Sequence, residues 1–300
     1  MKKVVNIEKT DSGFEDYILF DIETTGLSRT KDFMYMFGIC EKKEKELIYS
    51  QYYIEDEDEE KELILKVKEL LNSKKVISYN GDRFDFPFIR KKMEKYNITK
   101  FNFENIDLYR QFQKLNYFLD EPSLKAINLG KRLGLDVHDH VTQQEMPKIY
   151  KMYQELKDKE ILSKLIYHNY IDLKVLSYIY EYKENVLNKI LTINNKKFKG
   201  VLKTIYLQKN YLIARLLNTD KIDINFNESN YSITSNDDEI KISLELEEGL
   251  IENNVKAKVF KSKYENKIFK ESQNLTKNFV LIMKNNKFVK ENLLLLLHLI

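Results

Sequence analysis

The segment "YILFDIETTGL" (residues 17–27) runs from apolar residues into two acids, two threonines and a glycine. An ionised carboxylate without a partner is strongly unfavourable inside a buried strand. Asp21 and Glu23 are two residues apart, so on a strand both side chains point to the same face near its carboxyl end. Two carboxylates this close raise each other's pKa unless a cation lies between them. The pair therefore predicts a site for a hard divalent ion such as Mg²⁺; for an isolated pair, the alternative is two surface acids.

The size and composition of the chain set the first limits on its class. Its 300 residues are 43% hydrophobic, which allows a sizeable core and argues against disorder. A formal charge of +3 excludes a general polycation, so any affinity for nucleic acid must come from a local patch. Cys40 is the only cysteine, and the apolar run at 293–300 is far shorter than the ~20 residues of a membrane span. Because Glu8 and Asp11 interrupt the first segment, we expect no signal peptide and a soluble, cytoplasmic protein without a membrane partner.

The first part of the chain alternates strand-like and helix-like segments. Three β-branched or aromatic runs with short links (17–23, 33–39 and 47–54) predict an antiparallel meander. A further strand is predicted at 76–80, and residues 105–112 are predicted to form a strand that leads into a helix. The other predicted helices are 86–95, 123–135 with Ser123 as N-cap, 145–157 and 160–192. This order indicates an α/β fold, a mixed sheet with helices on both faces.

After residue 192 the pattern changes. A helix is predicted around 202–217 and a hairpin over 279–289. Alternating segments typical of a half-exposed antiparallel sheet are 222–226, 240–246 and 255–259. Residues 190–300 carry 18 lysines and arginines against 13 acids, whereas the remainder carries 32 against 34. We therefore predict two domains, 1–192 and a smaller, more basic α+β domain over 193–300.

Two further segments place an acid beside a predicted apolar element. In "SYNGDRFDFPFI" (78–89), Asp85 follows a buried strand at the expected start of a helix. In "YHNYIDLKVL" (167–176), Asp172 lies on a helix whose apolar residues could contact the sheet. His168 precedes Asp172 by four residues, about one helical turn, so both side chains share a face.

The motifs "FDIETTGL", "YNGDRFDFPFI" and "HNYIDLKVL", in this order, resemble the three exonuclease motifs of the DEDD superfamily, which has a ribonuclease H-like fold. The intervening "IDLYRQF" and "SLKAINLGKRLGL" are similar to the bacterial YprB-like branch of exonucleases. The resemblance covers roughly residues 15–185, and three motifs in order are highly specific. It implies a mixed five-stranded sheet with flanking helices.

The resemblance also implies a role for each acid. Asp21 would bridge two Mg²⁺ or Mn²⁺ ions, and Asp85 would serve the second ion, partly through water. Glu23 and Asp172 would complete the site of the ion that holds the attacking water, and His168 would be the general base. Hydrolysis of a phosphodiester needs a nucleophile at neutral pH and a neutralised leaving oxygen, which two metals provide. The implied activity is 3′→5′ exonuclease cleavage of single-stranded or frayed nucleic acid.

The third motif departs from the family pattern in its spacing. The histidine subtype has its base five residues before the last acid, and the tyrosine subtype has a tyrosine four residues before it. Here His168 occupies position four and Tyr167 position five. Helical geometry favours His168 as the base. Tyr167 is the alternative, and ordinary packing is the simpler interpretation of its ring.

The resemblance implies substrate contacts as well. Thr24, Thr25 and Gly26 would lie against the terminal nucleotide, where glycine permits close approach of the backbone. Leu27 would wedge against a base, and Asn80 would contact the scissile nucleotide or order its turn. The expected partners are the 3′ ends of DNA or RNA.

Three alternatives accompany this hypothesis. The fold could serve as a binding module with little turnover, or as a structure-specific endonuclease. The segment "VHDHV" (137–141) invites a zinc interpretation, but two histidines do not complete a tetrahedral site, so a solvated loop is favoured. Asp107, in a predicted strand, is interpreted as structural or as a residue that supports the metal ligands without binding the ions itself.

Overall fold

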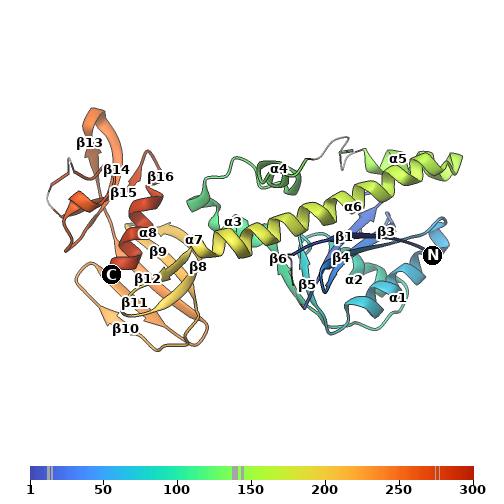
Figure 1. The fold of residues 1–300 in the computed structure, drawn as a ribbon, viewed down its shortest axis with the longest axis horizontal. Helices are drawn as coiled ribbons and strands as arrows, with labels where there is room; N and C mark the ends of the chain where they lie inside the picture. Colours follow the sequence, from blue (N-terminus) through green and yellow to red (C-terminus); the bar gives the residue numbers. More distant parts are fainter. Residues whose placement is uncertain (12–13, 15, 137–140, 143–144, 274, 277) are drawn as a thin grey trace. The chain divides into compact units, whose positions relative to one another are not determined.

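The computed structural model describes residues 1–11, 14, 16–136, 141–142, 145–273, 275–276 and 278–300 (Figure 1). The chain divides into two compact units. The first comprises Met1–Arg110 and Ser123–Lys183, and the second comprises Gln111–Pro122 and Glu184–Ile300. The predicted domain boundary at residue 192 stays a prediction.

A six-stranded mixed sheet forms the centre of the first unit, with the order β1-β4-β3-β2-β5-β6. The strands are β1 (Lys2–Lys9), β2 (Tyr17–Thr24), β3 (Met34–Lys43), β4 (Glu46–Tyr53), β5 (Lys75–Ser78) and β6 (Glu104–Asp107). Strands β2, β3 and β4 pair antiparallel, which confirms the predicted meander. Strand β5 pairs parallel with β2, and β6 with β5.

The sheet has one strand more than the five predicted. Strand β1 pairs antiparallel with β4 along its whole length and forms an edge of the sheet. Its sequence "KKVVNIEK" is mostly exposed and carries three lysines, as edge strands often do. An exposed edge strand lacks the apolar alternation by which the other strands were predicted.

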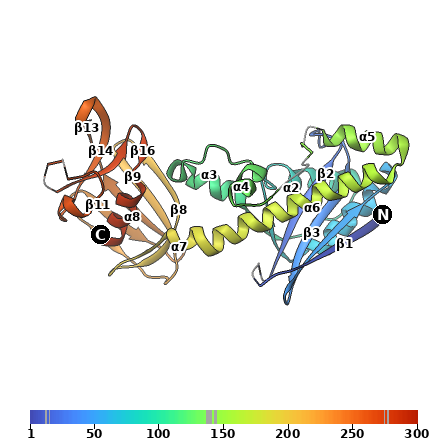
Figure 2. The ribbon, with the colours of Figure 1, turned by 45° about the horizontal axis from the view of Figure 1, so that its top comes forward.

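Helices cover both faces of this sheet (Figure 2). The helices between β4 and the end of the first unit are α1 (Glu60–Leu71), α2 (Asp85–Lys95), α3 (Leu108–Leu119, most of which belongs to the second unit), α4 (Ala126–Arg132), α5 (Met146–Leu156) and α6 (Lys159–Tyr182). Phe20 of β2 stacks on Phe86 of α2 at 5.7 Å, whereas the next residue, Asp21, contacts Asn169 of α6. Because successive strand residues face opposite ways, α2 and α6 lie on opposite sides of the sheet.

Most predicted helices of the first unit are confirmed, with one wrong cap. The helix predicted to start after Ser123 begins at Ala126 instead, and Lys125 is its N-cap. The Ser123 hydroxyl accepts from the Asn128 side chain at 2.8 Å and so closes the turn that precedes α4. Among the described residues, no helix combines the length and apolarity that a lipid bilayer requires.

The second unit contains two antiparallel sheets, with the orders β10-β11-β12-β9-β8-β7 and β13-β14-β15-β16. Its strands are β7 (Thr192–Asn194), β8 (Lys199–Gln208), β9 (Tyr211–Asn218), β10 (Asn225–Asn227), β11 (Tyr231–Ser235), β12 (Glu239–Glu245), β13 (Glu247–Ile251), β14 (Val255–Lys261), β15 (Phe279–Lys284) and β16 (Lys287–Phe288), and helices α7 (Asn188–Ile190) and α8 (Lys290–Leu299) complete it. The predicted hairpin over 279–289 is confirmed as β15 and β16.

The helix predicted around 202–217 is wrong. This segment forms an antiparallel hairpin of β8 and β9, in which Leu207 pairs with Leu212. Lys209, with φ 54°, makes the tight turn between the strands. Apolar residues occur so often in both strands that a helical period fits them as well as a period of two does. Pairing with a neighbouring strand decides between the two patterns.

Candidate active site

Strand β2 supplies the first two acids. Asp21 and Glu23 share the face of β2 that α6 covers, while Phe20 and Ile22 point to the opposite side. Glu23 is buried and Asp21 is half-buried. The apolar residues between and before these acids fix the strand in the sheet, so its carboxyl end holds both carboxylates in place.

Helix α6 brings a histidine and a third acid to the same place. His168 Nε2 lies 3.4 Å from Asp172 Oδ2 and 3.8 Å from Glu23 Oε1. One ligand atom from each of these three residues lies within 4.8 Å of the others, so the group could hold a metal ion. The i,i+4 spacing on α6 explains why His168 and Asp172 point together.

Asp85, the fourth acid, begins α2. Its Oδ1 accepts a hydrogen bond from the backbone N–H of Ile22 at 3.3 Å, between the two acids of β2. Asp85 also raises the pKa of Asp21 by repulsion, as do Asp172 and Glu23. Four carboxylates from three separate segments therefore converge.

Burial is the main reason why these carboxyl groups have raised pKa values. It raises the pKa of Asp85 and of Asp172 to about 7, and that of Asp21 and Glu23 well above the ordinary range. Among the described residues, the buried Glu23 Oε1 has no hydrogen-bond partner. The oxygens of four carboxylates, one of them buried and unsatisfied, fit a hard divalent cation such as Mg²⁺ or Mn²⁺.

Asn169 is a residue of this site that sequence reasoning missed. It is fully buried, and its Nδ2 donates to Asp21 Oδ2 at 2.9 Å. Its Oδ1 accepts from Gln51 Nε2 of β4 at 3.3 Å. By hydrogen bonding, Asn169 counteracts part of the rise in the pKa of Asp21 and of Glu23. In the sequence, the only indication was the position of Asn169 between His168 and Asp172, and this position does not show which residue its amide contacts.

Strand β3 provides the space for Asn169. A Cβ atom on Gly38 would lie 2.1 Å from Asn169 Oδ1 and 2.6 Å from Leu173 Cδ1. A side chain at this position would force Asn169 or Leu173, both buried, to shift, so the glycine provides the space where α6 crosses β3.

The two candidates for the general base differ in orientation. His168 is buried and faces the acids, whereas Tyr167 is 46% exposed. The ring of Tyr167 packs near Tyr170, at 6.3 Å between ring centroids.

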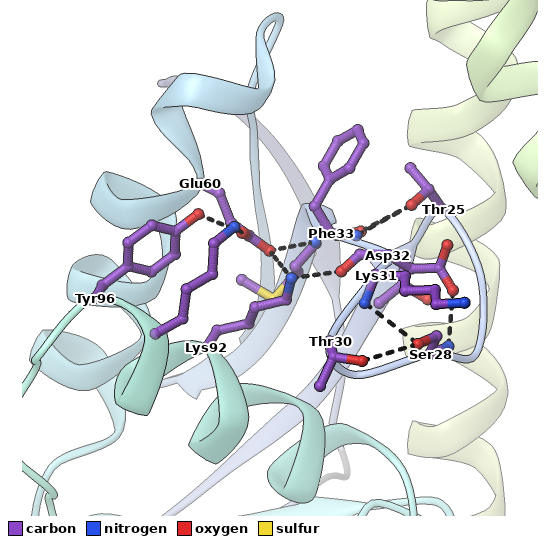
Figure 3. Close-up of polar contacts among 12 residues, drawn as sticks. Thr25, Ser28, Thr30, Lys31, Asp32, Phe33, Glu60, Lys92 and Tyr96 are labelled. Atoms are coloured by element: carbon purple, nitrogen blue, oxygen red, sulfur yellow. Dashed lines mark hydrogen bonds and ion pairs between the residues drawn. The ribbon is translucent and has the colours of Figure 1, made fainter.

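Residues predicted to hold the terminal nucleotide lie in the loop that joins β2 to β3 (residues 25–33, the β2–β3 loop; Figure 3). Thr24 Oγ1, just before it, donates to the Gly26 carbonyl at 2.8 Å, and Thr25 Oγ1 accepts from Phe33 N at 3.1 Å. Leu27 is 76% exposed, so its side chain is available to a ligand.

Asn80 lies in the turn between β5 and α2. It has a positive φ of 65°, which asparagine tolerates better than most residues. Asp107 accepts from the N–H groups of Asn80 (2.9 Å), Asp82 (3.2 Å) and Arg110 (3.3 Å). Asp107 therefore shapes this turn, which supports its structural interpretation. Among the described residues, Asn80 Oδ1 is buried without a hydrogen-bond partner.

A pocket of about 630 Å³ lies directly beside the acids. Asp21, Asn80, His168 and Asp172 line one part of it, and aromatic and basic groups line another, namely Tyr79, Tyr109 and Lys125. Tyr79 and Tyr109 pack edge to face at 5.7 Å. His138 and His140, the basis of the zinc alternative, lie outside the described residues.

Residues 18–183 match the family model described as the RNase_H superfamily. The match covers more than half of the chain and contains all four acids and His168. The chain belongs to the RNase H superfamily. The narrower YprB-like branch stays a prediction.

Among curated proteins the chain is similar to DNA polymerase III PolC-type. The protein of Mycoplasma pneumoniae is 26% identical over 184 residues, which is 53% of this chain and 13% of that protein. The protein of Mycoplasma genitalium is 23% identical over 219 residues, which is 66% of this chain and 14% of that protein. The aligned part therefore spans only a small fraction of these relatives.

Solved structures of Escherichia coli exonuclease I also match. The complex with a dT13 oligonucleotide has 12% identity and a TM-score of 0.36, covering 67% of this chain and 55% of that one. The ExoI/SSB-Ct complex has 13% identity and a TM-score of 0.34, covering 73% and 55%. Scores of this size carry no weight for function.

Proposed function

We propose that this chain is a metal-dependent 3′→5′ exonuclease that acts on single-stranded or frayed nucleic acid. The main support is the convergence of Asp21, Glu23, Asp85 and Asp172 beside His168 at the wall of a pocket. Membership of the RNase H superfamily agrees with nuclease chemistry. The similarity to PolC-type DNA polymerases is consistent with a nucleic-acid substrate.

The four acids would hold two divalent ions. When bound, such ions lower the pKa of a water nucleophile and neutralise charge on the leaving oxygen. Asp21, which interacts electrostatically with each of the other three acids, would be the ligand shared between the ions. Asn169 keeps the Asp21 carboxylate oriented through its 2.9 Å hydrogen bond.

His168 would take the proton of the attacking water. Its Nε2 faces Glu23 and Asp172, both proposed ligands of the ion that holds this water. An imidazole with an ordinary pKa near 6.5 accepts a proton at neutral pH. Tyr167 is exposed, whereas His168 is buried beside the acids, which favours His168 for this role.

The pocket would hold the terminal nucleotide. Tyr79 and Tyr109 offer aromatic surfaces to a base, and the exposed Lys125 offers a charge to a phosphate. Asn80, which lines the pocket, and the segment from Thr24 to Leu27 would contact the sugar and base. Stacking and charge recognise single strands with little sequence preference, so both DNA and RNA are candidate substrates.

A nuclease assay with oligonucleotides labelled at either end tests this proposal. With Mg²⁺ or Mn²⁺, the wild type should release mononucleotides from the 3′ end and leave circular single strands intact. Asp21→Asn and Asp85→Asn should each reduce the rate by about 10³-fold or more, because the ions lose a ligand. Glu94→Gln is the matched control, since Glu94 lies on α2 with Asp85 but pairs with Lys91 at the surface.

Three results would contradict the proposal. Undiminished cleavage by both Asp variants would remove the acids from the chemistry. Cleavage of circles would indicate an endonuclease. Tight binding of oligonucleotides without products, at every metal concentration, would indicate a binding module.

A further inference from the structure

A buried ion pair lies where the β2–β3 loop meets helices α1 and α2 (Figure 3). Lys92 Nζ is 3.2 Å from Glu60 Oε1, and each side chain is only 1% exposed. Removing two charges from water costs about as much as their attraction returns, so such a pair is weak support for stability. Since stability alone does not account for the pair, its role is sought in the groups that it contacts.

The contacts of the pair show what it holds. Lys92 Nζ donates to the backbone carbonyl of Asp32, and Glu60 Oε1 accepts from the backbone N–H of Met34 at 2.8 Å. Tyr96 orients the other Glu60 oxygen through a 2.5 Å hydrogen bond. The two charges therefore fix the main chain at the point where the β2–β3 loop enters β3.

Hydrogen bonds within the loop connect Asp32 and Phe33 to the part of the loop that is proposed to contact the substrate. Asp32 Oδ2 accepts from Ser28 N at 2.7 Å, and Thr25 N donates to the Phe33 carbonyl at 3.0 Å. A shift of Asp32 or Phe33 would therefore move Ser28 and Thr25 directly. Across the loop, Arg29 donates to the Arg83 carbonyl at 2.7 Å, beside the start of α2.

We propose that Glu60 and Lys92 are positioning residues for the 3′-terminal nucleotide. They contact no substrate; they hold the β2–β3 loop in the shape that presents Thr25, Gly26 and Leu27 to it. This inference rests on the proposed exonuclease function. A charged pair suits the task because the Lys92 ammonium and the Glu60 carboxylate satisfy two backbone groups from a fixed, buried position.

The double variant Glu60→Gln/Lys92→Met tests the inference. It removes both buried charges together, because Glu60→Gln alone would remove the carboxylate that pairs with the buried Lys92 ammonium, whereas Glu60 also pairs with Lys95 at 3.4 Å. The amide oxygen introduced at position 60 retains an acceptor for Met34 N, whereas the link from position 92 to Asp32 is lost. We expect KM for a single-stranded oligonucleotide to rise about tenfold, with kcat changed less than about threefold, since the loop binds rather than reacts. The rise in melting temperature on adding Mn²⁺ should stay as in the wild type.

Lys91→Met is the matched control, because Lys91 neighbours Lys92 on α2 but pairs with Glu94 at the surface, at 2.8 Å. Its KM and kcat should equal those of the wild type. If the double variant does not fold, Asp32→Ala decides, since it loosens the β2–β3 loop by removing the hydrogen bond from Ser28 N and leaves the buried pair in place. It should raise KM in the same way.

The outcomes separate the two proposals. A wild type that releases no nucleotides contradicts the proposed function itself. An active wild type with an unchanged KM in the folded double variant, or in Asp32→Ala where that variant decides, overturns the positioning role. A fall in kcat together with loss of the Mn²⁺ effect also overturns it, because the pair would then support the acids rather than the loop.

Discussion

Four carboxyl groups share one partly buried site, and their pKa values are raised because their negative charges are unfavourable there. Burial raises the pKa of Asp85 and Asp172 to about 7, while repulsion from its neighbours adds to the rise at Asp21. The sequence predicted this effect for Asp21 and Glu23, because their spacing on a strand is local information. It could not predict the relief that Asn169 gives Asp21, because that hydrogen bond joins residues 148 positions apart.

Because burial and mutual repulsion make the four carboxylate charges unfavourable, we predict that divalent ions stabilise the protein. Saturating Mn²⁺ should raise the melting temperature by roughly 5 °C or more, because binding restricted to the folded state adds free energy of unfolding. Differential scanning calorimetry with Mn²⁺ or with EDTA measures this. The double variant Asp85→Asn/Asp172→Asn should lose the effect, and a full Mn²⁺ response in that variant would contradict the assignment of these acids.

The pH dependence of this stabilisation has a definite sign. Asp85 and Asp172 have pKa values raised from 3.8 to about 7 on folding, so the folded state holds protons that the unfolded chain has released. Without metal, the free energy of unfolding therefore falls as pH rises from about 4 to about 7. Metal competes with these protons, so the rise caused by Mn²⁺ should be larger at pH 8 than at pH 6. A larger rise at pH 6 would contradict this.

At the scale of elements, the site depends on the close crossing of α6 over β3. The His168–Asp172 spacing belongs to α6 itself and was predictable from helical periodicity. The closeness of the crossing depends on Gly38 and Asn169, which are far apart in sequence and have no local pattern. The wrongly predicted helix at 202–217 reflects the same limit, since only strand pairing distinguishes it from the β8–β9 hairpin.

Gly38→Ala tests this crossing. The new methyl group would overlap Asn169 and Leu173 and push α6 away from β3. We expect a loss of about 1–3 kcal/mol in the free energy of unfolding and at least a tenfold lower nuclease rate, because His168 and Asp172 move from Asp21. Denaturant unfolding and single-turnover kinetics measure the two effects. Gly249→Ala is the control, since a Cβ atom there meets nothing within 4 Å; a Gly38 variant that behaves like it would contradict the inferred contact.

At the scale of the whole molecule, the chain does not divide at a single point. Gln111–Pro122 belongs to the second unit, although it lies between two parts of the first in sequence. Its contacts explain this: Lys287 pairs with Asp120 at 2.5 Å, and Tyr117 packs edge to face on Phe288 at 5.1 Å. The boundary at residue 192 was placed from composition, which gives no information on the grouping of residues 111–122 with the second unit.

Hydrogen exchange of the full chain tests whether this grouping is cooperative. As denaturant rises, amides of residues 111–119 should lose protection together with those of β8 and β9. Amides of α4, which follows at Ala126–Arg132, should instead follow the sheet of the first unit. Mass spectrometry of peptides from both segments measures this, and exchange of 111–119 in step with α4 would contradict the grouping.

The sequence by itself determined much of the local structure and the local arrangement of the proposed site residues. Period-2 and helical spacing placed Asp21 beside Glu23 and His168 beside Asp172, because these neighbours lie within one strand or one helical turn. Only the tertiary structure decided that Asn169 fits against Gly38, that Lys92 and Glu60 hold the β2–β3 loop, and that residues 111–122 join the second unit. Each of these depends on contacts between side chains or backbone groups distant in sequence, and no local pattern encodes which distant partner a residue will meet.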